Sequence, residues 1–238
     1  MVKLTTNAQL KALAKISEVV ASDGYLENIL EQVVAIVAEL MNSNICSLML
    51  LNDQTKFLEI KATQSFSNLY INKQPLKLGE GIAGKVALQN KPITIKDVSK
   101  EPEYKHQDIA QKEGLKSLLC VPLCVRNNVI GVINCYTSEP HSFTKSEIAL
   151  LLTISNLAAI SFENTNLIIK SKLIEEELAM RKKIERAKGI LMKEANLSEE
   201  EAYKRLKNYS MNNRKSMEDI ADIILIVDEI KHPVKGDH

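Results

Sequence analysis

The stretch LKSLLCVPLCVRNNVIGVINCYTS, residues 115–138, decides the fold of the first half of the chain. Two apolar runs of strand length, 115–125 and 129–138, flank a polar turn at Arg126–Asn128. Such runs joined by a short polar turn predict a β-hairpin. CSLMLLND (46–53) and KFLEIKAT (56–63) predict a second hairpin, and PITIKDV (92–98) predicts a further short strand.

Helical patterns surround these strands. We expect helices over 7–20 and 25–41, because apolar residues in the second recur at helical spacing and Asp23 is a suitable N-cap. The glycine-rich LGEGIAGK (78–85) predicts a turn that opens a short helix over 82–89. It lacks the spacing of a phosphate-binding P-loop, although a phosphate cradle stays open as the alternative. The polar residues 99–114 predict short helices and loop.

Composition limits the classes of function. The chain has 238 residues, a net charge of +1 and four cysteines, none in a CxxC pair, which we expect to be small buried hydrophobes. We find no serine in a His/Asp setting and no paired-carboxylate motif, so we expect no catalytic residue, no enzyme activity and no metal site. The N-terminus lacks the apolar region of a signal peptide, which predicts a cytoplasmic protein without a membrane partner.

A long helix follows the strands. Thr144 and Glu147 form a capping-box pattern, and no Pro or Gly interrupts the run up to residue 188. An average helix has only about 11–12 residues. We expect packing on the first domain over 148–162 and a parallel dimeric coiled coil from about 165 to 192, in two heptad registers. The first register runs through Leu157, Ile160, Asn164, Leu167, Ser171, Ile174 and Leu178, and the second through Leu173, Glu177, Met180, Ile184, Ala187 and Leu191.

Positive charge is concentrated in residues 181–215. This block carries eleven basic and five acidic side chains, a net charge of +6, whereas residues 1–169 are neutral. At about 100° per residue, four positions form one helical stripe: Lys182, Arg186, Gly189 and Lys193. The block predicts a polyanion site, with close backbone approach at Gly189. A solvated basic face, or a second helix packed against Gly189, is the alternative.

Residues 7–165 resemble a GAF domain. The matching segments are LGEGIAGKVALQNKPITIKDV (78–98) and LKSLLCVPLCVRNNVIGVINCYTSEPHSFTKSEIALLLTISNLAAISFEN (115–164). The resemblance implies an α+β fold, with a central antiparallel sheet flanked by helices, and a role in sensing small molecules or in dimeric signalling. The signatures of cyclic-nucleotide and bilin GAF domains are absent, so no cofactor is named. Tyr104 and His106, in the polar segment 99–114, are the expected ligand-binding residues.

Residues 170–228 resemble an ANTAR domain through IERAKGILMKEANLSEEEAYKRLKNYSMNNRKSMEDIADIIL (184–225). The resemblance implies a three-helix unit on a coiled-coil stalk, and a homodimer that binds paired hairpins in leader RNA and prevents termination. We expect a GAF sensor over 1–165, a connector over 166–180, the ANTAR unit over 181–230 and a tail over 231–238. The expected RNA contacts are Lys182, Arg186, Lys188, Gly189, Lys193, Lys204, Arg205, Ser210, Asn213, Arg214 and Lys215.

Two other functions stay open: a DNA-binding regulator with a GAF sensor, and a ligand-binding dimerisation module without nucleic-acid activity. The last expected helix, opened by Ser216, carries four acidic residues that duplex DNA would repel, which favours RNA: Glu218, Asp219, Asp222 and Asp228. Tyr203 and Tyr209 are expected either to stack on bases or to pack in the core. A small-molecule ligand or a signalling protein is the expected partner of the GAF domain.

Overall fold

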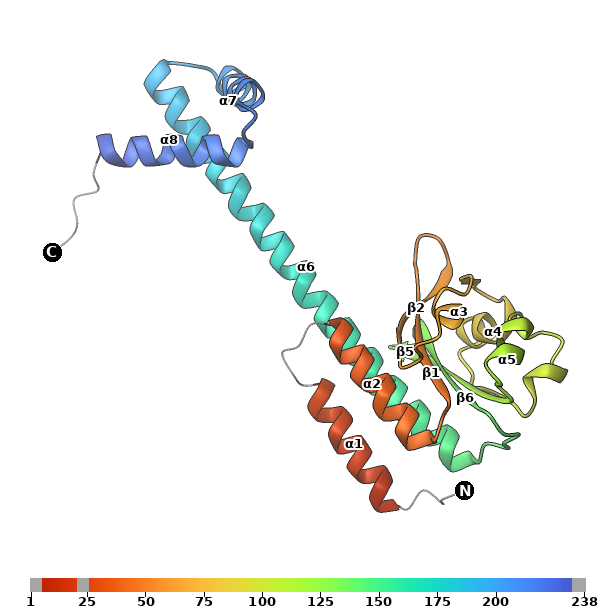
Figure 1. The fold of residues 1–238 in the computed structure, drawn as a ribbon. Coiled ribbons are helices and arrows are strands. Elements are labelled where there is room, and N and C mark those ends of the chain that lie inside the picture. The colour runs from red at the N-terminus through yellow and green to blue at the C-terminus, as the bar shows by residue number, and fades with distance from the viewer. Residues whose placement is uncertain (1–5, 21–25, 233–238) are drawn as a thin grey trace. The chain divides into compact units, whose positions relative to one another are not determined.

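The computed structural model describes residues 6–20 and 26–232. The chain divides into two compact units, Met1–Asn166 and Leu167–His238. Helix α6 (Lys145–Ala195) passes from the first unit into the second (Figure 1). The expected N-cap Asp23 and most of the expected C-terminal tail lie outside the described residues.

A six-stranded antiparallel sheet forms the centre of the first unit, in the order β3-β2-β1-β6-β5-β4. Both predicted hairpins are confirmed, since β5 pairs with β6 and β1 pairs with β2. Arg126 and Asn127 both have positive φ, 49° and 67°, as a two-residue hairpin turn of the primed type requires. The strands are β1 (Ile45–Leu51), β2 (Phe57–Thr63), β3 (Leu76–Lys77), β4 (Ile93–Ile95), β5 (Ser117–Val125) and β6 (Asn128–Thr137).

Helices cover both faces of this sheet, which explains why its central strands are almost continuously apolar. One core cluster joins α1, α2 and the start of α6 to the sheet and includes Leu48 and Leu151, whereas the other lies on the opposite face and includes Met49 and Tyr136. Leu48 and Met49 belong to different clusters because successive side chains of a strand alternate. The helices are α1 (Thr6–Val20), α2 (Leu26–Met41), α3 (Asn68–Ile71), α4 (Gly81–Gln89), the 3₁₀ helix η1 (Val98–Lys100) and α5 (Gln107–Lys112).

The glycine-rich turn before α4 is explained by close packing. Gly79 has a φ of +85°, and a Cβ on Gly84 would clash with the backbone carbonyl oxygen of Lys77. The glycines therefore let the start of α4 approach β3, as the turn interpretation predicts. All four cysteines lie in strands, and Cys46, Cys120 and Cys135 are buried.

Three capping boxes set the starts of the last helices. At α6, the Thr144 backbone N–H donates to Glu147 Oε2 at 2.6 Å, and the Glu147 N–H donates to Thr144 Oγ1 at 3.2 Å. Ser198 caps α7 (Glu199–Asn213) with Glu201, and Ser216 caps α8 (Met217–Lys231) with Asp219. A small apolar core holds the second unit together: Ala187, Ala202, Leu206, Ile220, Ala221 and Leu225.

Helix α6 has two kinds of apolar side chain. In the first unit, Leu151, Ile154 and Ala158 are fully buried in the core. Among the described helices, α6 is apolar and long enough to cross a membrane by length and composition alone, but 39% of that window is buried inside the protein. Further along, a set of large apolar side chains is exposed: Ile160, Leu167, Ile168, Ile169, Leu173, Ile174 and Leu178.

Candidate nucleic-acid interface and ligand cavity

The basic block of the second unit is only partly neutralised by its own carboxylates. Four of its eleven cations form ion pairs: Arg181 with Glu177, Lys183 with Glu218 and Asp222, Lys188 with Glu185 and Glu199, and Lys204 with Glu200. The other seven are exposed, and within the described residues none of them forms an ion pair with a carboxylate. These seven are Lys182, Arg186, Lys193, Arg205, Lys207, Arg214 and Lys215.

Lys188, one of the expected RNA contacts, is buried. Its side chain is only 9% exposed, and Nζ donates hydrogen bonds to Glu185 and Glu199, each at 2.8 Å. Hydrogen bonds to these two carboxylates raise the pKa of Lys188. The RNA contact expected for Lys188 stays a prediction, but its side chain is buried beside Ala187 and ties α6 to the first turn of α7.

The predicted stripe on α6 is present on the surface. Lys182, Arg186, Gly189 and Lys193 are all exposed. A Cβ built on Gly189 meets no atom within 4 Å in the described structure. Among the described residues, therefore, no helix packs against Gly189, and the backbone there is open to a ligand.

The expected RNA contacts Ser210 and Asn213 lie in the last turn of α7. Arg214 ends the helix in the left-handed region with a φ of 51°. The Ser210 hydroxyl donates to the Lys215 carbonyl at 2.6 Å, and the Asn213 amide donates to the Tyr209 carbonyl at 2.8 Å. Both of these expected RNA contacts thus also satisfy backbone carbonyls at the helix end.

Two tyrosines of α7 are exposed rather than packed in the core. Tyr203 is 44% exposed and Tyr209 is 58% exposed. Arg205 and Tyr209 are one helical turn apart and therefore lie on the same face. Spacing along the helix would not have revealed this, since Tyr209 lies three residues after Leu206 and seven after Ala202, and so on the same side of α7 as these buried residues.

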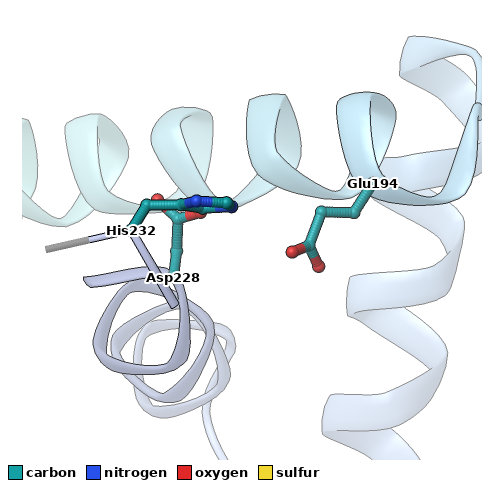
Figure 2. Close-up of side chains that lie close together, drawn as sticks. All are labelled: Glu194, Asp228 and His232. Atoms are coloured by element: carbon teal, nitrogen blue, oxygen red, sulfur yellow. The ribbon is translucent and has the colours of Figure 1, made fainter. Parts of the chain in front are cut away.

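A groove of about 430 Å³ lies between the end of α6 and α8. The stripe residues Arg186, Gly189 and Lys193 line it, together with three residues whose ligand atoms lie within 4.8 Å of one another: Glu194, Asp228 and His232. Figure 2 shows Glu194 extending toward Asp228 and His232. Lys231 Nζ already binds both Glu194 oxygens, at 2.9 and 3.2 Å. We therefore interpret this cluster as an ion-pair network that makes the groove mixed in charge.

The first unit contains a small cavity between the sheet and the segment 99–114. Both expected ligand residues, Tyr104 and His106, line it. Sequence reasoning missed two further polar residues of its wall, Lys73 and Asn134, which come from distant parts of the chain. The Tyr104 hydroxyl donates to the Tyr136 hydroxyl at 3.3 Å, so part of the polar wall is satisfied internally.

Comparison with known families identifies a matching domain family for each of the two units. Residues 26–163, more than half of the chain, match the GAF domain model. The chain belongs to the GAF domain family. Residues 173–225 match the ANTAR domain model, so the predicted order of a GAF domain followed by an ANTAR domain is confirmed. An ANTAR domain implies an RNA-binding antitermination regulator, and a GAF domain implies a sensor; neither is a catalytic domain.

Relatives of the GAF domain occur in larger proteins. The phosphoenolpyruvate-dependent phosphotransferase system protein of Escherichia coli (strain K12) is 27% identical over 152 residues, 63% of this chain and 20% of that protein. The methyl sulfide methyltransferase-associated sensor of Methanosarcina acetivorans is 28% identical over 155 residues, 63% of this chain and 16% of the sensor. The chain therefore spans at most a fifth of these two relatives.

A solved structure supports the same assignment of the fold. The GAF domain of a phosphoenolpyruvate-protein phosphotransferase from Coxiella burnetii is 28% identical, with a TM-score of 0.62. The match covers 67% of this chain and 95% of the solved one. The α+β fold expected from the sequence is thus confirmed.

Proposed function

We propose that this protein is a homodimeric antitermination regulator that binds paired hairpins in a leader RNA and responds to a signal received by its GAF domain. The observation that carries the proposal is the set of seven exposed cations in 181–215 that have no carboxylate partner among the described residues. A surface that retains such charge in a chain of net charge +1 attracts a polyanion.

The exposed groups of α7 favour RNA. Proteins that read RNA sequence contact unpaired loop bases, by stacking on aromatic or guanidinium planes and by hydrogen bonds to base edges. Arg205 and Tyr209 offer such planes on one face, next to Asn213 at the helix end. The acidic side chains of α8, in contrast, are poorly suited to a helix that enters the major groove of DNA. We propose that the stripe on α6 holds phosphates while the end of α7 contacts the loop.

The exposed apolar side chains of α6 support a homodimer. Leu167, Ile174 and Leu178 are 52%, 66% and 51% exposed, and they recur at the alternating spacing of a coiled-coil seam. A row of exposed large apolar residues on one helix is costly in water unless another surface covers it. A second copy supplies an identical row, and a dimer would present two RNA-binding units to two hairpins.

A gel-shift assay tests RNA recognition. We expect the protein to bind a two-hairpin leader RNA more tightly than either single hairpin or duplex DNA of the same sequence. Arg186→Glu should weaken binding, whereas Lys112→Glu, at an exposed lysine of α5, should not. Preference for duplex DNA would favour the DNA-binding regulator, and no binding to either would favour the dimerisation module.

Antitermination itself needs a functional assay. In transcription in vitro from a template with a terminator downstream of two hairpins, the protein should increase read-through. Arg186→Glu should abolish the increase without changing the rate of elongation before the terminator. Unchanged read-through with a leader that the protein binds tightly would refute the proposed role in termination.

A further inference from the structure

The cavity of the GAF domain contains buried polar atoms that nothing in the described structure satisfies. Asn134, in the middle of β6, is 1% exposed, and its Oδ1 has no hydrogen-bond partner. His106 Nε2, on the opposite wall, is also buried and without a partner. Both residues line the cavity. Because a buried polar atom without a partner is destabilising, two such atoms around one cavity point to a missing bound group.

The chemistry of these two atoms defines one side of the ligand. Oδ1 of an asparagine only accepts hydrogen bonds. Burial and the nearby Lys73 lower the pKa of His106, which favours the neutral ring. The Gln74 backbone partly offsets this lowering of the pKa, as a carbonyl that accepts from the ring does, and in that tautomer of the neutral ring the unpartnered Nε2 is an acceptor. The bound group must therefore donate hydrogen bonds.

The other side of the cavity is lined by a lysine, which favours an anionic ligand. Lys73 lines the cavity, and its Nζ lies 4.0 Å from the centre of the Tyr70 ring. Within the described residues this ammonium group has no carboxylate partner, and burial lowers its pKa to about 7. An anionic group beside Nζ would stabilise the charged lysine. Lys105, also on the wall, is already paired with Glu80 at 3.4 Å.

Size restricts the ligand and indicates how it enters. The free volume is about 10 Å³, close to the minimum for one water molecule. A larger molecule therefore has to be compact and has to displace the cover formed by residues 101–106. This cover is held to α4 and its start by two ion pairs, Lys105–Glu80 and Lys85–Glu103, which join partly or largely exposed side chains. Exposed ion pairs are weak, so the main cost of opening is the exposure of Tyr104, which is 6% exposed and packs edge-on against Tyr136.

We infer that this cavity binds a compact organic anion that carries a hydrogen-bond donor next to its acidic group, namely a small 2-hydroxy or 2-amino acid. The acid group lies beside Lys73, and the hydroxyl or ammonium group donates to Asn134 Oδ1 and His106 Nε2. This inference rests on the sensor role proposed for the GAF domain and specifies its signal. Ligand entry displaces residues 101–106, which changes the surface of the GAF domain.

Isothermal titration calorimetry of the full-length protein at about pH 7 tests the inference with four probes of similar size. Glycolate carries an anion and a hydroxyl, glycine an anion and an ammonium group, acetate only the anion, and ethanolamine only the donors. We expect glycolate or glycine to bind at least about tenfold more tightly than acetate and ethanolamine, the effect of one well-made hydrogen bond to a charged group. Which of the two binds identifies the class of acid.

Variants assign the effect to the cavity. Asn134→Leu should remove the preference over acetate, and Lys73→Met should weaken all three acids by at least about tenfold. Lys112→Met, at an exposed lysine of α5, should change neither. The inference would be overturned if neither glycolate nor glycine bound more tightly than acetate. Circular dichroism and urea titration of the same samples show whether the variants are folded, and gel shifts with RNA show separately whether the RNA-binding role holds.

Discussion

Replacing Ile174 by alanine should weaken the dimer strongly. The change removes three carbons, each worth about 0.8 kcal/mol when fully buried. Because Ile174 is 66% exposed within one chain, about two-thirds of this burial remains to be gained from a partner. The loss is then about 1.6 kcal/mol per chain and about 3 kcal/mol per dimer. That free energy corresponds to an increase of about 200-fold in the dimer dissociation constant.

Sedimentation equilibrium over a range of protein concentrations measures this constant directly. Ile169→Ala is the matched control, because Ile169 is also exposed, at 48%, and lies on the opposite side of α6 from the proposed seam. Both changes alter helix propensity equally, so the difference between them reports contact with the partner. Equal dissociation constants for the two variants, or a monomeric wild-type protein at micromolar concentration with and without RNA, would refute the coiled-coil reasoning.

Three other predictions concern single side chains. Lys188→Met should lower the free energy of unfolding of the ANTAR domain more than Lys182→Met, because of these two lysines only Lys188 ties α6 to α7. Urea titrations followed by circular dichroism measure both values, and equal effects would contradict the structural role of Lys188. Arg214→Ala should weaken RNA binding and reduce its salt slope by about 1. Gly189→Leu should weaken RNA binding without unfolding, since a Cβ there meets no atom of the described residues within 4 Å. Unchanged affinity in both variants would show a solvated surface. Between the folded pKa of Lys73, about 7, and its ordinary value of 10.5, the unfolded chain binds more protons, so this lysine should make stability rise with pH by up to about 1.4 kcal/mol per unit. Lys73→Met should reduce that rise in urea titrations across this range, and an identical slope would contradict a desolvated lysine.

Sequence patterns were reliable where the determining contacts are local. The capping boxes at Thr144 and Ser198 form as predicted, because both partners of each box lie within one helical turn. The hairpin of β5 and β6 forms because its turn residues Arg126 and Asn127 adopt positive φ between two apolar runs. The same patterns missed the short α3 and β3, whose few residues carry almost no periodic signal.

Predictions about individual site residues were weaker, since they depend on neighbours that are distant in sequence. Lys188 belongs to the basic block by sequence, but the acidic first turn of α7 brings Glu199 to its ammonium group. Ser210 and Asn213 belong to a polar segment that is typical of a loop, but helix α7 continues to Asn213 and uses both side chains on its last carbonyls. Exposure of Tyr203 and Tyr209 likewise depends on which face of α7 packs against α6 and α8.

The sequence by itself determined the two domains, the helices and strands that build them, and the concentration of charge in residues 181–215, because periodicity, capping and net charge are properties of contiguous residues. Only the tertiary structure decided which of those charges remain without a carboxylate partner, and which polar atoms meet around the GAF cavity. Lys73, His106 and Asn134 lie on separate elements and carry no shared motif. Their common cavity exists because the order of strands in the sheet and the packing of the segment 99–114 bring them together. Because their unpaired polar groups are buried there, those groups indicate a bound ligand.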